Sequence, residues 1–137
     1  MKIRFLLVAG VLFSISVLSS CRWHHRSHGV SVSVNDDVSV SINEDEDVYQ
    51  LSARFDDDKT EEVERYIKQC TEDGHAFNYG GHGNMDATLT LDDNTRVYIR
   101  SREGRLKIKF NKEENSEASY ERVKDMCEGI KELLARN

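Results

Sequence analysis

The chain has 137 residues, with 19 Lys or Arg and 25 Asp or Glu, and its formal net charge is −6 at pH 7. This length suffices for one domain with a single core. This excess of acidic residues argues against nucleic-acid binding as the main function, because phosphate contacts need clustered Lys and Arg. We therefore expect one small domain with no nucleic-acid partner.

Residues 1–20 contain the parts of a bacterial export signal. Basic residues at positions 2 and 4 precede an apolar run that ends at Val17. The next four residues, Leu-Ser-Ser-Cys ending at Cys21, resemble the lipobox of bacterial lipoproteins. The resemblance covers the first 21 residues only. It implies cleavage before Cys21, whose sulfur then carries a diacylglyceryl group and whose new amino group carries a fatty acid such as palmitate.

The resemblance also implies a location in the cell envelope. Many lipoproteins retained in the inner membrane have an aspartate after the lipidated cysteine, whereas Arg22 stands here. We therefore expect the outer membrane, with the lipid at Cys21 as the contact to the bilayer. The alternative is an uncleaved transmembrane anchor. A spanning helix needs about 20 predominantly apolar residues, and the apolar run here ends in serines after Val17.

Three histidines, His24, His25 and His28, follow within five residues. A short histidine-rich tract can bind a divalent metal, so a metal-binding lipoprotein is an alternative function. Neighbouring residues supply no obvious second shell for such a site. Trp23 and its flanking arginines also suit a segment beside lipid headgroups. We assign no metal ligand.

An eight-residue unit occurs twice, at 30–37 and 38–45, and Val or Ile alternates with Ser in both copies. This alternation has the period of a half-buried strand, and the Asn-Asp pair is typical of a turn. The segment is either a hairpin on the main domain or an extended tether. The acidic run at 44–47 favours the tether. We therefore expect a tether over 21–47 and a folded domain over 48–137.

Hydrophobic periodicity within 48–137 predicts a strand, a helix, a three-strand antiparallel meander and a second helix. The first strand covers 48–55, and a helix with apolar residues at helical spacing covers 58–73. The meander covers 87–110, and a helix capped by Asn115 or Ser116 follows. Each helix has one apolar side. This pattern predicts an α+β two-layer sandwich with both helices on one face of the sheet.

The loop at 73–85 contains four glycines together with His75 and His82. It lacks the phosphate-binding pattern GxxxxGK[ST] and precedes a strand. The two histidines are candidates for a metal site or for the acid–base group of a small hydrolase. The simpler interpretation is a loop without chemistry. Because no catalytic motif is present in the chain, we expect a protein that is not an enzyme and has no cofactor.

Two cysteines remain besides Cys21, and each lies on the apolar stripe of a predicted helix. In an exported protein, Cys70 and Cys127 therefore predict a disulfide between the helices. The alternative is a pair of buried free thiols.

The outward face of the meander is basic. Its candidate binding residues are Arg96, Tyr98, Arg100, Lys107 and Lys109, with Arg105 on the same face and Arg54 as a possible neighbour. The partner would be an acidic protein, an anionic glycan or the chain's own acidic run at 44–47. Alternatively, these cations only keep an open sheet face soluble. The sequence thus predicts a non-enzymatic binding module, anchored in the envelope membrane, that acts through this face.

Overall fold

The computed structural model describes residues 28–33, 36–71 and 84–136. Several predictions fall outside these ranges and stay predictions, namely the signal segment, the lipidation site Cys21, the metal candidates His24 and His25, and the glycine-rich loop with His75 and His82. His28 begins the first strand, but its side chain also lies outside the described part.

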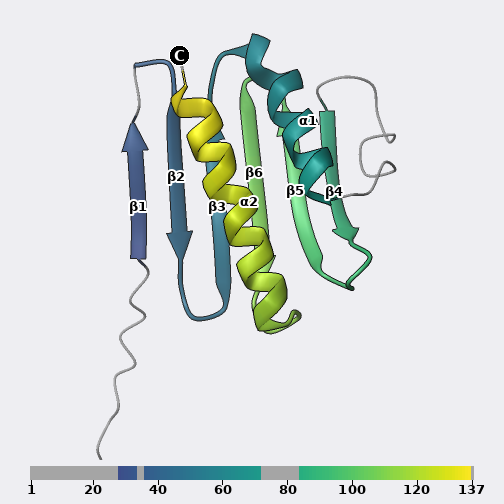
Figure 1. Cartoon of the computed structure of the whole chain (residues 1–137). Helices are drawn as coiled ribbons and strands as arrows, with labels where there is room; N and C mark the ends of the chain where they lie inside the picture. The colour runs from purple at the N-terminus through teal and green to yellow at the C-terminus, as the bar shows by residue number, and fades with distance from the viewer. Residues whose placement is uncertain (1–27, 34–35, 72–83, 137) are drawn as a thin grey trace, which may run out of the picture.

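One six-stranded antiparallel sheet forms a layer, and two helices lie across one of its faces (Figure 1). The strand order is β1-β2-β3-β6-β5-β4. The strands are β1 (His28–Ser33), β2 (Ser39–Glu44), β3 (Val48–Arg54), β4 (Asn84–Thr90), β5 (Arg96–Arg102) and β6 (Arg105–Asn111). The helices are α1 (Thr60–Thr71), which follows the 3-10 turn η1 (Asp57–Lys59), and α2 (Glu117–Ala135). The predicted α+β sandwich, with both helices on one face, is confirmed.

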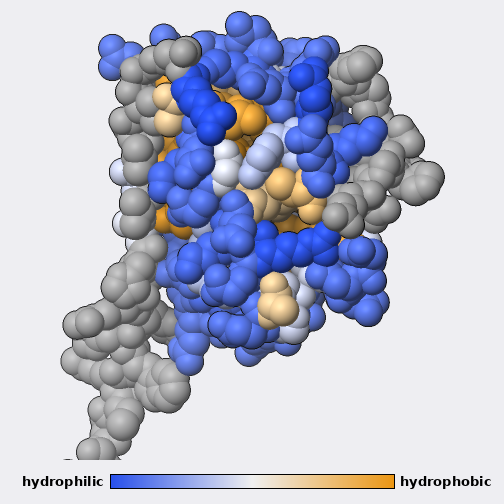
Figure 2. All heavy atoms as spheres, in the orientation of Figure 1, coloured by the Kyte–Doolittle hydropathy of each residue, from blue (hydrophilic) through white to orange (hydrophobic). Residues whose placement is uncertain are grey.

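Alternating hydrophobic residues on β2 to β6 build the core between the sheet and the helices. Its fully buried members include Leu51, Val63, Ile67, Ile99, Ile108, Phe110, Ile130 and Leu134. On the helix side, hydrophilic residues cover most of the surface and hydrophobic ones show between the elements (Figure 2). The helix cap at Ser116 is as predicted, because the Ser119 N–H donates to its hydroxyl at 3.1 Å.

The Val-Ser repeat is part of the sheet, so the predicted tether over 21–47 is wrong for the strands β1 and β2. Val40 and Ile42 are only 2% and 8% exposed, and they pair in register with Ala53 and Leu51 of β3. The reason is that β3 offers a free edge to a segment in which Val38, Val40 and Ile42 all project to the buried side. The serines then face solvent on the other side.

The acidic run at 44–47 forms the connection between β2 and β3. The Asp45 carboxylate accepts hydrogen bonds from the backbone N–H groups of the second and third residues after it, at 3.0 and 2.7 Å. The Glu44 carboxylate accepts from Lys112 Nζ and from the Tyr120 hydroxyl, both at 2.7 Å. These contacts join β2 to the end of β6 and to α2. They rule out the alternative in which Glu44 and Asp45 would occupy the basic face.

The two helix cysteines are free thiols in the structure. Cys127 is buried on α2, and burial raises the pKa of its thiol to about 12. Cys70 is half-buried on α1 and packs against the core. A thiol with the raised pKa of Cys127 is protonated at neutral pH and reacts slowly. The predicted disulfide between the two cysteines stays a prediction.

Packing of β2 against the core is testable with Val40→Ala. If the repeat is a buried strand, the variant should lose about 2 kcal/mol of unfolding free energy, because two buried methyl groups are removed and a cavity remains. Urea unfolding followed by circular dichroism measures this. Asn43→Ala, at an exposed position of the same strand, is the matched control. Equal stability of Val40→Ala and the wild type would mean that this segment does not pack.

Candidate anion-binding face

The cross-strand register arranges the open face of the sheet in rows, because directly paired residues of an antiparallel sheet project to the same side. The first row consists of Ser39, Arg54, Arg105, Arg102 and Asn84. The second row consists of Ser41, Ser52, Lys107, Arg100 and Asp86. The third row consists of Asn43, Gln50, Lys109, Tyr98 and Thr88.

The structure brings four of the five predicted binding residues together. Arg100 and Lys107 are direct neighbours in the second row, and Tyr98 and Lys109 are direct neighbours in the third. Arg96 lies at the start of β5, beyond the third row. Its guanidinium is 3.4 Å from the carboxylate of Glu114, and both side chains are about half exposed, at 54% and 50%. Arg96 is therefore separate from the main group of cations.

The first and second rows surround a hollow of about 530 Å³. Its lining includes five cationic side chains, Arg54, Arg100, Arg102, Arg105 and Lys107. The hollow also has three serines, Ser39, Ser41 and Ser52. We call this site the basic hollow. It exists because short serine side chains on β2 and β3 stand beside long cationic side chains on β3, β5 and β6.

Sequence reasoning missed part of this site. Arg102 is not among the predicted binding residues, although the alternation on β5 continues through it. Ser39 and Ser41 were assigned to the tether. Arg54 was named only as a possible neighbour, because nothing local in the sequence indicates that β3 pairs with β6. The continued alternation at Arg102 was the one signal that could have been used.

Cations on this face are poorly neutralised. The only acid in the three rows is Asp86, which lies 3.4 Å from Arg100 Nε and accepts a hydrogen bond from the Tyr98 hydroxyl at 2.8 Å. That hydrogen bond raises the pKa of Tyr98. Within the described part of the chain, no carboxylate forms an ion pair with the three arginines of the first row.

The first row places like charges directly opposite each other. Arg105 pairs in register with Arg54 on one side and with Arg102 on the other. Directly opposed like charges destabilise a sheet, by up to about 1 kcal/mol for a pair. An anion bound among them would remove this repulsion. The row is therefore better suited to binding an anion than to stabilising the fold.

Gly104 fixes the turn between Arg102 and Arg105. Its φ of +67° lies in the left-handed region, and a Cβ atom there would come within 2.7 Å of the Phe55 carbonyl oxygen. The Gly104 N–H donates to Thr60 Oγ1 at 3.0 Å, and its carbonyl accepts from the Phe55 N–H at 3.0 Å. The turn is thereby tied to the end of β3 and the start of α1, which aligns the first row.

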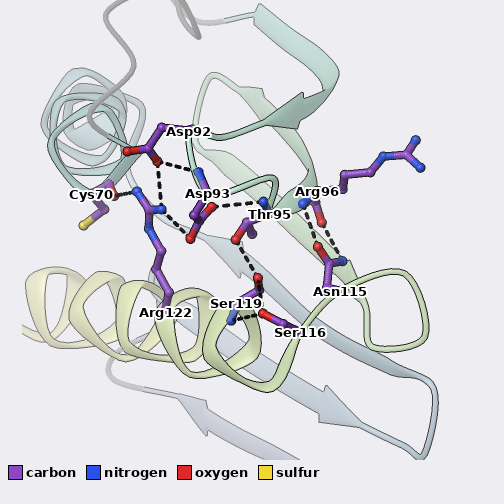
Figure 3. A network of polar contacts seen from close by, with 9 residues as sticks. All are labelled: Cys70, Asp92, Asp93, Thr95, Arg96, Asn115, Ser116, Ser119 and Arg122. Atoms are coloured by element: carbon purple, nitrogen blue, oxygen red, sulfur yellow. Dashed lines mark hydrogen bonds and ion pairs between the residues drawn. The ribbon is translucent and has the colours of Figure 1, made fainter.

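A polar network holds the other end of β5 against α2 (Figure 3). The Thr95 hydroxyl donates to the Ser119 hydroxyl at 2.8 Å, and both residues are buried. The Arg96 N–H donates to the side-chain oxygen of Asn115 at 2.7 Å, and Asn115 Nδ2 donates back to the Arg96 carbonyl at 3.0 Å. These bonds fix the position of β5 and hence of its cationic side chains.

Asp92 and Asp93, in the turn between β4 and β5, hold an arginine of α2. Arg122 Nη1 lies 3.1 Å from Asp92 and 2.8 Å from Asp93. Hydrogen bonds from Thr95, helped by the Arg122 guanidinium, hold the pKa of Asp93 at about 2. The pair therefore acts as a structural clamp between the β4–β5 turn and α2.

Other classes of site receive no support from the described part of the chain. Those residues contain no group of three His, Cys, Asp or Glu side chains placed to hold a metal ion. None of the helices they form has the length and apolar character needed to cross a membrane. A scan against protein-family models and searches of curated proteins and of solved structures found no match.

The Asp93 clamp predicts a pH dependence. A carboxyl group whose pKa is lowered on folding contributes stability above the pKa of the unfolded chain, near 3.9, and loses it as pH falls to the folded value. The wild type should therefore exceed Asp93→Asn in stability at pH 7, and this difference should shrink between about pH 4 and pH 2. Urea unfolding across that range measures it. Asp125→Asn makes the same charge change at an exposed position of α2 and is the control. A pH-independent difference would contradict the clamp.

Proposed function

We propose that this protein is a lipoprotein of the bacterial cell envelope, anchored in the outer membrane by acyl chains on Cys21. We further propose that it is a non-enzymatic binding module whose basic sheet face receives an anionic partner. The observation that carries this proposal is the group of cations in the first and second rows, of which only Arg100 has a carboxylate partner among the described residues.

Charge distribution supports a binding role over a role in solubility alone. The whole chain is acidic, with a net charge of −6, yet the open face gathers cations. Solubility is served by interspersed charges of both signs. Charges of both signs are neighbours elsewhere on the surface. On α2, for example, Lys131 Nζ lies 2.8 Å from Glu128 Oε2. A face used only for solubility would not need arginines placed directly opposite one another.

The short distance between lipid and sheet limits where the partner can be. β1 begins at His28, seven residues after Cys21. Seven extended residues span at most about 25 Å. The domain would thus be held close to the membrane surface. An acidic envelope protein or an anionic envelope glycan lies within this reach, and these are the partners we propose.

The proposal can be tested by photo-crosslinking in living cells, with the probe amino acid at Thr88. This exposed position on β4 is beside Tyr98 in the third row. The expected product is a discrete protein band if the partner is a protein, and a diffuse ladder if it is a glycan. Lys107→Glu combined with Lys109→Glu should abolish the product, because the face then repels an anion.

The matched control reverses two cations on the helix side. Arg65→Glu combined with Lys68→Glu makes the same change in net charge at exposed positions of α1 and should leave the crosslink intact. Loss of the product in both double variants would show only a general charge effect. Either that result or a crosslink that survives the reversal on β6 would contradict the proposal.

A further inference from the structure

We propose that the basic hollow binds a compact ligand that carries two or more phosphate groups. This inference rests on the proposed function and narrows it, because it specifies the chemistry of the anion. Three properties of the hollow carry it, namely its charge density, its donors and its place in the sheet.

Charge density favours phosphate over carboxylate. Neighbouring strands lie about 4.8 Å apart, and successive rows on one face about 7 Å apart. The five cations therefore surround a patch only about 10 Å wide. A phosphate monoester carries about −1.5 to −2 charges at pH 7, so about three phosphates balance the hollow. The same balance would need about five carboxylates, which is a large number to place in 530 Å³.

The donor set also fits phosphate. Four of the five cations are arginines, whose planar guanidinium groups form paired hydrogen bonds with phosphate oxygens. Ser39, Ser41 and Ser52 add neutral hydroxyl donors. Among the described residues, the lining contains no carboxylate and no aromatic ring. A sugar ring or a base would find no stacking surface there, so recognition depends on the charged oxygens of the ligand.

The hollow lies at the end of the sheet that is farther from the predicted membrane tether. The first row lies at the end of the sheet where β1 finishes, since Ser33 pairs with Ser39. The predicted membrane tether enters at the other end of β1, at His28. Five residues of strand separate these ends, which corresponds to about 17 Å. A ligand beyond the membrane surface can therefore reach the hollow directly.

The test is isothermal titration of the full chain, in a non-ionic detergent, with sodium tripolyphosphate. We expect saturable binding at a single site and weaker binding as salt is added. Orthophosphate and citrate are titrated in parallel, and both should bind at least about tenfold more weakly. Arg105→Gln should weaken tripolyphosphate binding at least about tenfold, because it removes charged hydrogen bonds. Arg65→Gln on α1, away from the hollow, should bind as the wild type does.

Two results would overturn the inference. One is tripolyphosphate binding that is absent or is unaffected by Arg105→Gln. The other is citrate binding as tight as tripolyphosphate binding, which would assign the hollow to carboxylates. The proposed function is judged separately, because the crosslink at Thr88 and its loss on reversing Lys107 and Lys109 do not depend on the kind of anion.

Discussion

Pairing between β3 and β6 determines which side chains come together on each face of the sheet. The register runs from Val48 opposite Asn111 to Arg54 opposite Arg105. On one side it brings Leu51 against Ile108 in the core, where both are fully buried. On the other side it brings two arginines together. Because side chains alternate along a strand, a shift of one residue would expose the hydrophobic set and bury the charged one. Burial of the hydrophobic residues therefore fixes the register that places Arg54 directly opposite Arg105.

This coupling explains why the basic face persists despite its electrostatic cost. The hydrophobic residues on the helix side supply enough burial to hold the register. Gly104, the Thr95 hydrogen bond to Ser119 of α2 and the Asn115 hydrogen bonds to Arg96 then fix the two ends of β5. The cations are therefore held in place by parts of the structure that they do not stabilise. Such an arrangement is pre-organised for an anion, because little further ordering is needed when one binds.

Much of the fold could be predicted from the sequence, because local periodicity carries the necessary signal. The alternation over 48–55, the meander and the stripe on the last helix each identify one element and its buried side. The Val-Ser repeat was misjudged because strict alternation is equally compatible with an extended chain. Whether such a segment becomes a strand of the sheet or stays an extended tether depends on a neighbouring strand with a free edge. That edge belongs to β3, and Glu44, part of the acidic run that favoured the tether, accepts hydrogen bonds from Lys112 and Tyr120.

The basic hollow could not be predicted as a unit for a related reason. Arg54 and Arg105 are 51 positions apart, and the sequence does not say that β3 pairs with β6. The meander alone places Arg100 beside Lys107, and these two residues were found. The serines that leave room for a ligand come from β2, which was assigned to the tether. Non-local pairing, rather than residue type, was the missing information.

We propose that the first row is maintained for binding at the expense of stability. The most direct test is the unfolding free energy of Arg105→Gln without ligand, measured by urea unfolding at low and high sodium chloride. Relief of the repulsion from Arg54 and Arg102 should stabilise this variant by about 0.5 kcal/mol at low salt. The gain should fade as salt screens the charges. A variant that is less stable than the wild type at low salt would contradict the account, because Arg105 would then be a structural residue.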